Sequence, residues 1–131
     1  MTDDVEKINQ AVASAEQFSE LYYKKIDSER HSIDKLYHET ANLTWNGNYV
    51  DGIADIKRFL LEKLPNSSTY VNCLDAQPVH DSAVGGNTTV LVTVAGTVRF
   101  GASQPAAFQQ NFLLAAKDSK WKIVTDTFRS Q

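Results

Sequence analysis

Residues 88–100, with the sequence TTVLVTVAGTVRF, alternate between two kinds of side chain. Successive side chains of a β-strand point to opposite faces, so the alternation divides this stretch into two surfaces. One surface is a core face and carries Val90, Val92, Val94, Val98 and Phe100. The other should meet water but is mostly small and uncharged, with Thr89, Leu91, Thr93, Ala95, Thr97 and Arg99. The stretch therefore predicts a long strand with little charge on either face.

Two more strand-like runs follow, at Phe108–Ala116 and Trp121–Phe128. The first of them repeats the division, because Phe108, Phe112 and Leu114 lie on one face. The opposite face carries only uncharged side chains, those of Gln109, Asn111, Leu113 and Ala115. A large neutral sheet face is usually covered. We expect a chain of 131 residues to cover one face of this sheet itself, so the other face indicates a partner.

The first part of the chain has the spacing of helices. Between residues 5 and 26 apolar side chains recur every three or four positions, at Val5, Ile8, Val12, Ala15, Phe18, Tyr22 and Ile26. A second, shorter helix is expected after Asp27 or Ser28, with three inward side chains, Ile33, Leu36 and Tyr37. A third helix follows Asp51-Gly52 and ends before Pro65. Its apolar stripe consists of Ile53, Ile56, Phe59, Leu60 and Leu64.

Turn signals complete the order of the elements. Asn46-Gly47 lies between two apolar runs and predicts a β-hairpin, because both residues tolerate positive φ. The strand pattern resumes at Tyr70–Val79, and a turn is expected around residues 85–87. Helices first and an antiparallel meander after them predict a single α+β domain over residues 1–131. The helices would pack on the concave side of a curved antiparallel sheet and leave its convex side exposed.

Composition excludes several classes of protein. The formal net charge is −3, so the basic footprint of a phosphate-backbone binder is missing and direct nucleic-acid binding is not expected. The most apolar stretch, Val90–Gly96, is too short to span a bilayer. The acidic, polar N-terminus is unlike a signal peptide. The single cysteine, Cys73, is expected to be a small buried side chain, and a reducing compartment, the cytosol or nucleus, fits this usage.

Candidate chemical groups are few. Phosphate-loop, dinucleotide-binding and serine-nucleophile motifs are missing from the sequence. His31 and His38 share a helix face with Asp34 in the expected helix, but solvated polar side chains explain them better than a metal site. His80 is expected in a turn with local hydrogen bonds.

Two strand carboxylates keep an enzymatic alternative open. Asp75 or Asp126 could point into the cone and act as the general base of a small isomerase or dehydratase. No inward histidine or carboxylate is evident as a companion, so a satisfied polar residue is the preferred interpretation. We therefore expect no catalytic, cofactor or metal site.

Two other sets of residues have competing interpretations. Trp45, Trp121 and Tyr49 are interpreted as sheet and core packing rather than as a stacking set for a ligand or peptide. Arg129 is expected to point outward with Thr127, beside an otherwise neutral surface. It is either a solvated C-terminal arginine or the partner of a carboxylate across an interface, and the residues themselves leave both open.

A family resemblance rests on five short stretches in order along nearly the whole chain. These are LTWNGN at 43–48, DAQPVHD at 75–81, TTVLV at 88–92, FQQNF at 108–112, and WKI at 121–123 with Phe128-Arg129. Together they resemble the nuclear transport factor 2-like family, and within it the export-related small subunits of the TAP-type mRNA export receptor. The resemblance implies a cone in which three N-terminal helices pack on a strongly curved antiparallel sheet.

The same resemblance implies a function without catalysis. Such small subunits pair sheet to sheet with a related domain of the large receptor subunit, which itself holds most of the pocket for phenylalanine-glycine (FG) repeat nucleoporins. Arg129 matches the family arginine that bridges to a buried acid of the large subunit. Ala76, Gln109, Asn111 and Thr127 fall where the family places interface side chains. The resemblance implies a place in mRNA export, in the nucleus, at the nuclear pore and in the cytoplasm.

The family also includes a homodimeric carrier of the GDP-bound GTPase Ran. That carrier has an acidic residue directly after the tryptophan, where this chain has Asn46. It also has acids in the loop after the long strand, where this chain has Gly101, Ala102 and Ser103. A site for basic GTPase residues would lose its charge complementarity here, so Ran carriage is not expected.

Overall fold

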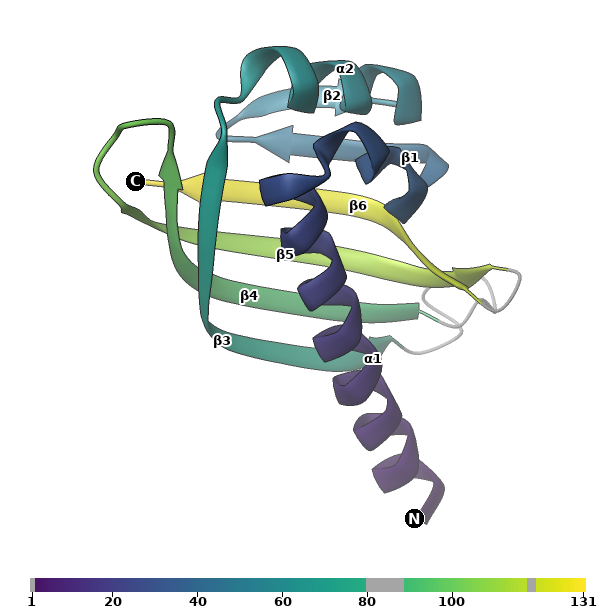
Figure 1. Cartoon of the computed structure of the whole chain (residues 1–131). Helices are drawn as coiled ribbons and strands as arrows, with labels where there is room; N and C mark the ends of the chain where they lie inside the picture. Colours follow the sequence, from purple (N-terminus) through teal and green to yellow (C-terminus); the bar gives the residue numbers. More distant parts are fainter. Residues whose placement is uncertain (1, 80–88, 118–119) are drawn as a thin grey trace.

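Helices precede a long meander of strands in the computed structural model of the protein, which describes residues 2–79, 89–117 and 120–131 (Figure 1). The helical elements are α1 (Thr2–Ser28), the 3₁₀ helix η1 (Arg30–Leu36) and α2 (Ile53–Lys63). The strands are β1 (Tyr37–Trp45), β2 (Asn48–Asp51), β3 (Ser67–Val79), β4 (Thr89–Phe100), β5 (Ala106–Lys117) and β6 (Lys120–Ser130). The predicted α+β class is confirmed.

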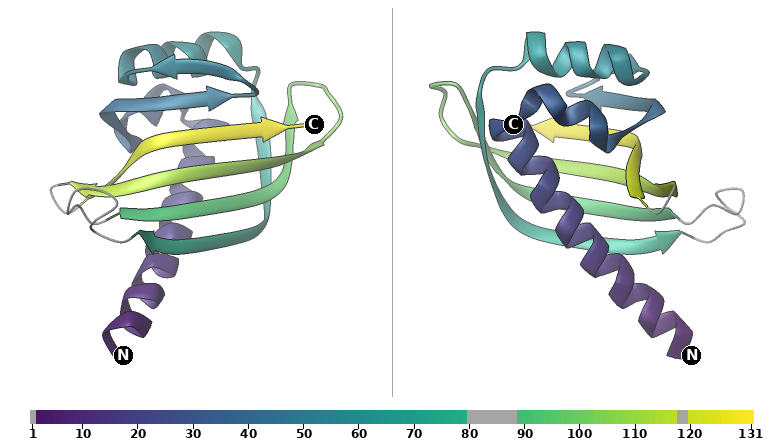
Figure 2. Two further views of the ribbon diagram at one scale, coloured as in Figure 1. Left: turned by 180° about the vertical axis from the view of Figure 1, so that it is seen from behind. Right: turned by 45° about the vertical axis from the view of Figure 1, so that its right-hand side comes forward.

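The strands form one six-stranded sheet in the order β2-β1-β6-β5-β4-β3. Four neighbouring pairs are antiparallel, but β1 and β6 are parallel. The prediction of a wholly antiparallel sheet is wrong at this pair, because no hairpin joins β1 to β6 and sets their relative direction. The sheet curves strongly, and all three described helical elements lie on its concave side (Figures 1 and 2). Its convex side carries no helix within the described residues.

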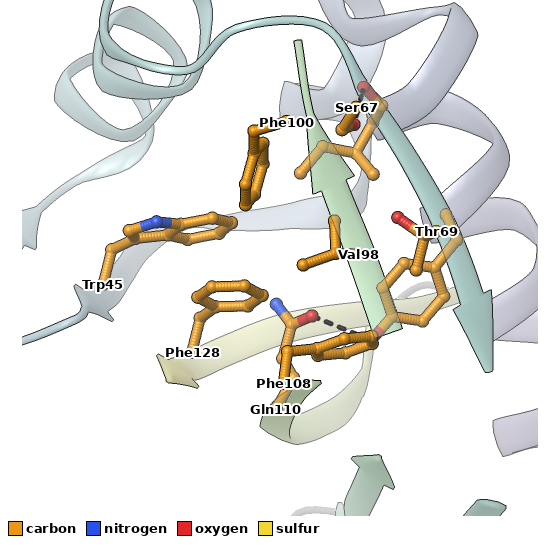
Figure 3. Close-up of a pocket in the computed structure, with 10 residues that line it drawn as sticks. Trp45, Ser67, Thr69, Val98, Phe100, Phe108, Gln110 and Phe128 are labelled. Atoms are coloured by element: carbon orange, nitrogen blue, oxygen red, sulfur yellow. Dashed lines mark hydrogen bonds between the residues drawn. The ribbon is translucent and has the colours of Figure 1, made fainter. Parts of the chain in front are cut away.

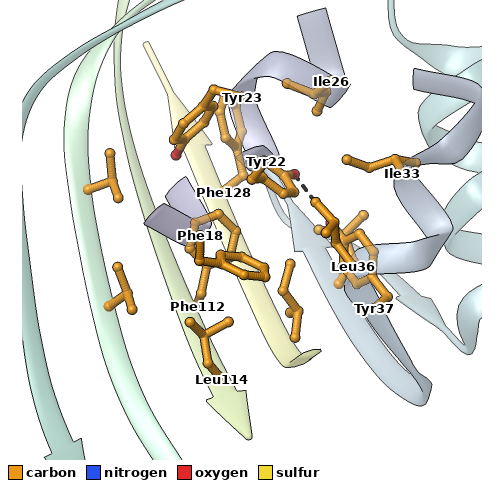
Figure 4. Packing of buried hydrophobic residues seen from close by; sticks show 14 of the residues in the cluster. Phe18, Tyr22, Tyr23, Ile26, Ile33, Leu36, Tyr37, Phe112, Leu114 and Phe128 are labelled. Atoms are coloured by element: carbon orange, nitrogen blue, oxygen red, sulfur yellow. Dashed lines mark hydrogen bonds between the residues drawn. The ribbon is translucent and has the colours of Figure 1, made fainter. Parts of the chain in front are cut away.

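The concave face of the sheet and the inner sides of the helices share one hydrophobic core. The alternation predicted for residues 88–100 is confirmed, since Val90, Val92, Val94 and Val98 are buried. Figure 4 shows Phe18 and Tyr22 of α1 lying against Phe112 of β5. The rings of Tyr22 and Phe112 meet edge to face, with 4.8 Å between their centroids. Such packing orients the helix on the sheet as well as burying apolar area.

Helix α1 is longer than the surface that it covers. Its predicted apolar stripe is buried from Ala15 to Ile26 with the adjacent Ala11. Val5 and Ile8, the first two members of the stripe, are 59% and 49% exposed. The helix runs past the edge of β3 at this end, so these side chains have no sheet beneath them (Figure 2). The prediction that they face the core is wrong for this reason.

Several predicted boundaries shift. The second helix is a 3₁₀ helix that ends at Leu36, and Tyr37 opens β1 instead of closing the helix. The hairpin at Asn46-Gly47 is confirmed, with φ values of 48° and 87°. Helix α2 ends at Lys63, two residues before Pro65, as predicted. The turn expected at residues 85–87 lies outside the described residues.

The curvature of the sheet has a local cause in β3 and β4. A β-bulge lies between Val71 and Cys73, opposite Gly96 and Ala95 of β4. A Cβ atom on Gly96 would lie 2.0 Å from the carbonyl oxygen of Tyr70, so only glycine allows the two backbones to approach here. Bulges and strand glycines bend a sheet, and the convex face depends on this bend.

Candidate partner-binding face

The convex side of the sheet carries the strand side chains that alternate with those of the core. Paired residues of neighbouring strands share a face, so the strand registers define rows across the sheet. One row crosses all six strands and consists of Tyr49, Thr44, Thr127, Asn111, Thr93 and Asp75. The next row consists of Asp51, Asn42, Thr125, Leu113, Leu91 and Gln77.

Charge in these two rows lies only at the margins of the sheet. Asp51 stands on β2 and Asp75 on β3, the two outermost strands. On the four inner strands both rows are neutral, and Leu91 is 40% exposed there next to its cross-strand partner Leu113. We call the side chains of these two rows and of the row of Arg129 the convex face. Its neutral centre is what the alternation in the sequence predicted.

Arg129 stands at one side of this neutral area. It belongs to a row with Gln109, Ala95 and Cys73. The Arg129 side chain is exposed, and within the described residues it makes no ion pair. The predicted outward direction of Arg129 is therefore confirmed. An unpaired guanidinium beside a neutral surface can receive a carboxylate in a bidentate geometry.

Three other predicted interface residues share the convex face with Arg129. Gln109 is exposed and lies directly opposite Arg129 in the register of β5 and β6. Asn111 and Thr127 are half-buried and lie opposite each other one row further along. The structure thus brings these four side chains together, and they supply hydrogen-bonding groups around one cation.

Ala76 does not belong to this face. It is 4% exposed and pairs with Val92, which is completely buried, so its side chain lies in the core. The resemblance implied Ala76 at the interface, and this is wrong for its side chain, because the β3 bulge adds one residue and reverses the alternation from Cys73 onward. The same reversal turns Cys73 outward, and the prediction of a buried Cys73 is wrong.

The interior holds a polar network around Asp126 of β6. Asp126 is completely buried and accepts hydrogen bonds from the Tyr37 hydroxyl at 2.5 Å, the Tyr22 hydroxyl at 3.4 Å and the Gln110 amide at 2.9 Å. The Tyr23 hydroxyl in turn donates to the side-chain oxygen of Gln110, Oε1, at 2.8 Å. Burial raises the pKa of the Asp126 carboxyl group to about 6, against the lowering effect of these hydrogen bonds.

The sequence indicated Asp126 and the inward direction of Tyr22 and Tyr37, but not that they bond to each other, and it missed Gln110. Gln110 lies between Phe108 and Phe112 and has the inward parity of both, which was the missed signal. Asp75, the other candidate base, is exposed on the convex face and cannot act inside the cone. Asp126 is therefore a buried carboxyl group whose oxygens both have hydrogen-bond partners.

Asp126 itself lines neither of two cavities in the described part of the chain. The cavity in Figure 3 has a volume of about 10 Å³, roughly one water, and Trp45, Phe100, Phe108 and Phe128 form much of its wall. Trp45 lies flat on Phe128, with 3.8 Å between the ring centroids. A wider surface hollow of about 670 Å³ is lined mainly by charged side chains. Tyr37, whose hydroxyl donates to Asp126, also lines this hollow, but Asp126 itself does not. The cone is filled by aromatic packing.

The remaining candidates lie apart from one another. His31 is exposed, Asp34 pairs with Lys57 at 3.4 Å, and the His38 ring accepts from the Thr40 amide. The described residues contain no group of three side chains placed to hold a metal ion. His80 lies outside the described residues. No described helix combines the length and apolar character needed to cross a bilayer.

The three aromatic candidates, Trp45, Trp121 and Tyr49, also lie in different places. Trp45 is 5% exposed inside the cone, and Trp121 is half-buried against the core. Tyr49 is 65% exposed on the convex face. Packing accounts for both tryptophans, as predicted, whereas Tyr49 is available at the outer edge of the candidate face.

A filled cone with helices on its concave side and a neutral convex sheet face defines a nuclear transport factor 2-like domain. The profile of the "Nuclear transport factor 2 (NTF2) domain" matches residues 14–130. The chain belongs to this family. The resemblance inferred from the five short stretches is thereby confirmed.

The chain is similar to export-related proteins over nearly its full length. NTF2-related export protein 1 of Bos taurus is 44% identical over 128 residues, which cover 95% of this chain and 91% of that protein. NTF2-related export protein 2 of Homo sapiens is 43% identical over 128 residues, covering 95% of this chain and 89% of that protein. Among solved structures, nuclear transport factor 2 from Cryptosporidium parvum matches with a TM-score of 0.82 at 26% identity, covering 93% of this chain and 95% of that one.

Proposed function

We propose that this chain is the small, non-enzymatic subunit of a nuclear mRNA export receptor. It pairs through its convex face with the related domain of a large TAP-type receptor subunit. By holding that domain in place it supports the binding of FG-repeat nucleoporins by the large subunit, and it works in the nucleus, at the nuclear pore and in the cytoplasm. The names of the similar export proteins support the export role.

The observation that carries this proposal is the neutral centre of the convex face with Arg129 at its side. Two rows across six strands place charge only on the outermost strands. A partner sheet can cover such a centre without burying unpaired charges. Leu91 and Leu113 supply apolar contact area, and Gln109, Asn111 and Thr127 supply hydrogen-bonding groups near the arginine.

Arg129 is the charged residue of the proposed interface. In this role its guanidinium pairs with a carboxylate of the partner, and the pair is desolvated as the sheets meet. Removing one member of a desolvated charge pair costs about 2–5 kcal/mol, largely because the other charge stays buried without a partner. Arg129 is therefore the residue on which binding depends most.

Two other functions that the fold allows find no support in the described residues. A dehydratase or isomerase would need a substrate pocket that reaches Asp126, but Asp126 is completely buried and lines neither the cavity of about 10 Å³ nor the surface hollow of about 670 Å³. A carrier of Ran would need the acids that Asn46 and the segment 101–103 lack. The Asn46 side chain is also hydrogen-bonded to Ser130.

Mutation of Arg129 tests the proposal. We expect Arg129→Ala and Arg129→Glu to weaken binding to the purified NTF2-like domain of the large receptor subunit by about 3 kcal/mol, roughly 150-fold in Kd. Isothermal titration calorimetry measures the change. Arg58→Ala is the matched control, because Arg58 is an exposed arginine on α2, beside Asp55 and away from the convex face. Wild-type affinity in both Arg129 variants would refute this role.

A further inference from the structure

The end of strand β6 is held by a residue far away in the sequence. Arg129 is the last residue but one of β6. The end of a strand frays unless other contacts hold it. A frayed Arg129 would present its guanidinium in many directions, so the direction observed here needs a cause.

Asn46, at the tip of the β1–β2 hairpin, makes three hydrogen bonds to the two neighbours of Arg129. The backbone amide of Asn46 donates to the backbone carbonyl oxygen of Phe128 at 2.9 Å. The Ser130 amide donates to Asn46 Oδ1 at 2.8 Å, and Asn46 Nδ2 donates to Ser130 Oγ at 3.1 Å. The backbone is thus fixed on both sides of Arg129.

Two further contacts set which face Arg129 occupies. Phe128 stacks on Trp45 inside the cone, so the next side chain along the strand points to the convex side. The Gln131 amide donates to the carbonyl oxygen of Ala107 at 3.0 Å and continues the pairing with β5. Arg129 and Ser130 also lie in register with Gln109 and Phe108 of β5. Among the described residues, Asn46 alone makes side-chain hydrogen bonds to Ser130.

The carboxamide of asparagine suits this position in two ways. It offers an acceptor to the Ser130 amide and a donor to the Ser130 hydroxyl at the same time. Its backbone also has φ of 48°, in the left-handed region that asparagine tolerates better than most residues. A carboxylate would keep the acceptor and lose the donor, and a methyl group would lose both.

We propose that Asn46 is a positioning residue that fixes the end of β6 and thereby directs Arg129 toward a partner. The consequence for binding rests on the proposed function, whereas the fixing of β6 does not. Asn46 makes no direct contact with the partner in this proposal and acts through Arg129. Loss of the Asn46 side chain therefore changes affinity only while Arg129 is present.

Amide hydrogen exchange of the isolated chain tests the first half. We expect Asn46→Ala to speed exchange of the Ser130 amide about 10-fold or more, and Asn46→Asp to have a smaller effect. Asn48→Ala is the matched control: Asn48 lies in the same hairpin, and its side chain donates to the Trp45 carbonyl oxygen and makes no hydrogen bond to β6 within the described residues. Unchanged protection of Ser130 in Asn46→Ala would overturn the proposal.

A double-mutant cycle tests the second half with the purified NTF2-like domain of the large receptor subunit. Asn46→Ala should weaken binding about 10-fold in the wild-type background and less than about 2-fold in the Arg129→Ala background. Equal losses in both backgrounds would overturn the action through Arg129. If the wild-type chain does not bind the domain, the proposed function fails, and faster Ser130 exchange in Asn46→Ala would still establish that Asn46 fixes β6.

Discussion

The Asp126 carboxyl group is completely buried, and burial raises its pKa from the ordinary value of 3.8 to about 6. The folded state therefore holds this proton more tightly than the unfolded chain does. The resulting stabilisation is present in full below pH 3.8 and is lost as the pH rises through 6. One pKa unit corresponds to ~1.4 kcal/mol, so keeping Asp126 ionised in the fold costs about 3 kcal/mol at neutral pH.

Replacing the carboxyl group by a neutral amide should remove this pH dependence. Asp126→Asn keeps an acceptor for Gln110 and a polar group facing Tyr37. Between pH 4 and pH 8 we expect the wild type to lose about 2 kcal/mol of unfolding free energy relative to the variant. Urea unfolding across this range measures the difference. Parallel pH curves for the two proteins would contradict it.

The hydrogen bonds of the network need their own control. Asp126→Leu removes the acceptor of the Tyr37 hydroxyl and of the Gln110 side-chain amide, which keep only their longer contacts with the Tyr22 hydroxyl, at 3.2 and 3.3 Å. Buried donors left unsatisfied cost about 1–3 kcal/mol each, at every pH in the series. We expect Asp126→Leu to lower the unfolding free energy by the same amount at every pH. For Asp126→Asn we expect a difference from the wild type that changes with pH. The two variants thereby distinguish the contribution of hydrogen bonding from that of ionisation.

Single residues were predictable where alternation is regular. The parity of β4, β5 and β6 placed Arg129, Gln109, Asn111 and Thr127 correctly on the convex face. The β3 bulge could not be anticipated from the sequence, so Cys73 was wrongly expected to be buried, and Ala76, which the family resemblance placed at the interface, lies in the core. Because a strand repeats every two residues, one inserted residue reverses every side chain after it.

Arg30 of η1 forms hydrogen bonds to three other elements. The sequence predicts the order of these elements along the chain but not the contacts between them. Its guanidinium donates to the carbonyl oxygens of Leu60, Leu64 and Pro65 at the end of α2, to Ile26 of α1, and to Ser67 Oγ of β3. The last carbonyls of a helix lack intrahelical donors, and a cation near them also interacts favourably with the helix dipole. The sequence predicted these elements, but not a cap supplied from another element.

Loss of Arg30 should therefore loosen three elements together. We expect Arg30→Ala to lower the unfolding free energy by about 3 kcal/mol and Arg30→Lys by about half as much, because an ammonium group cannot make the same fan of hydrogen bonds. Urea unfolding measures both. Arg58→Ala, which removes an exposed pair with Asp55, should stay within about 0.5 kcal/mol of the wild type. An equally small effect of Arg30→Ala would contradict the capping role.

The two layers of the molecule, helices on one face of a sheet, could be predicted from the sequence. The pairing of strands distant in the sequence could not. Apolar periodicity separated helices from strands and indicated one neutral sheet face. The parallel pairing of β1 with β6 joins Leu43 to Asp126, and no local pattern in the sequence encodes a contact between such distant segments. That pairing is what brings Asn46 to the end of β6.

The buried core and the proposed partner-binding face are different surfaces of this molecule. The buried core lies between the helices and the concave face, whereas Arg129 is exposed on the convex face. We therefore expect the isolated chain to unfold cooperatively and Arg129→Glu to change its unfolding free energy by less than about 0.5 kcal/mol. Adding the NTF2-like domain of the large receptor subunit at 100 times its Kd should stabilise the wild type by about 2.7 kcal/mol and leave Arg129→Glu almost unchanged. Urea unfolding of both chains, with and without that domain, measures the four free energies. A chain that loses cooperative unfolding through Arg129→Glu alone would place Arg129 in the fold and not in the interface.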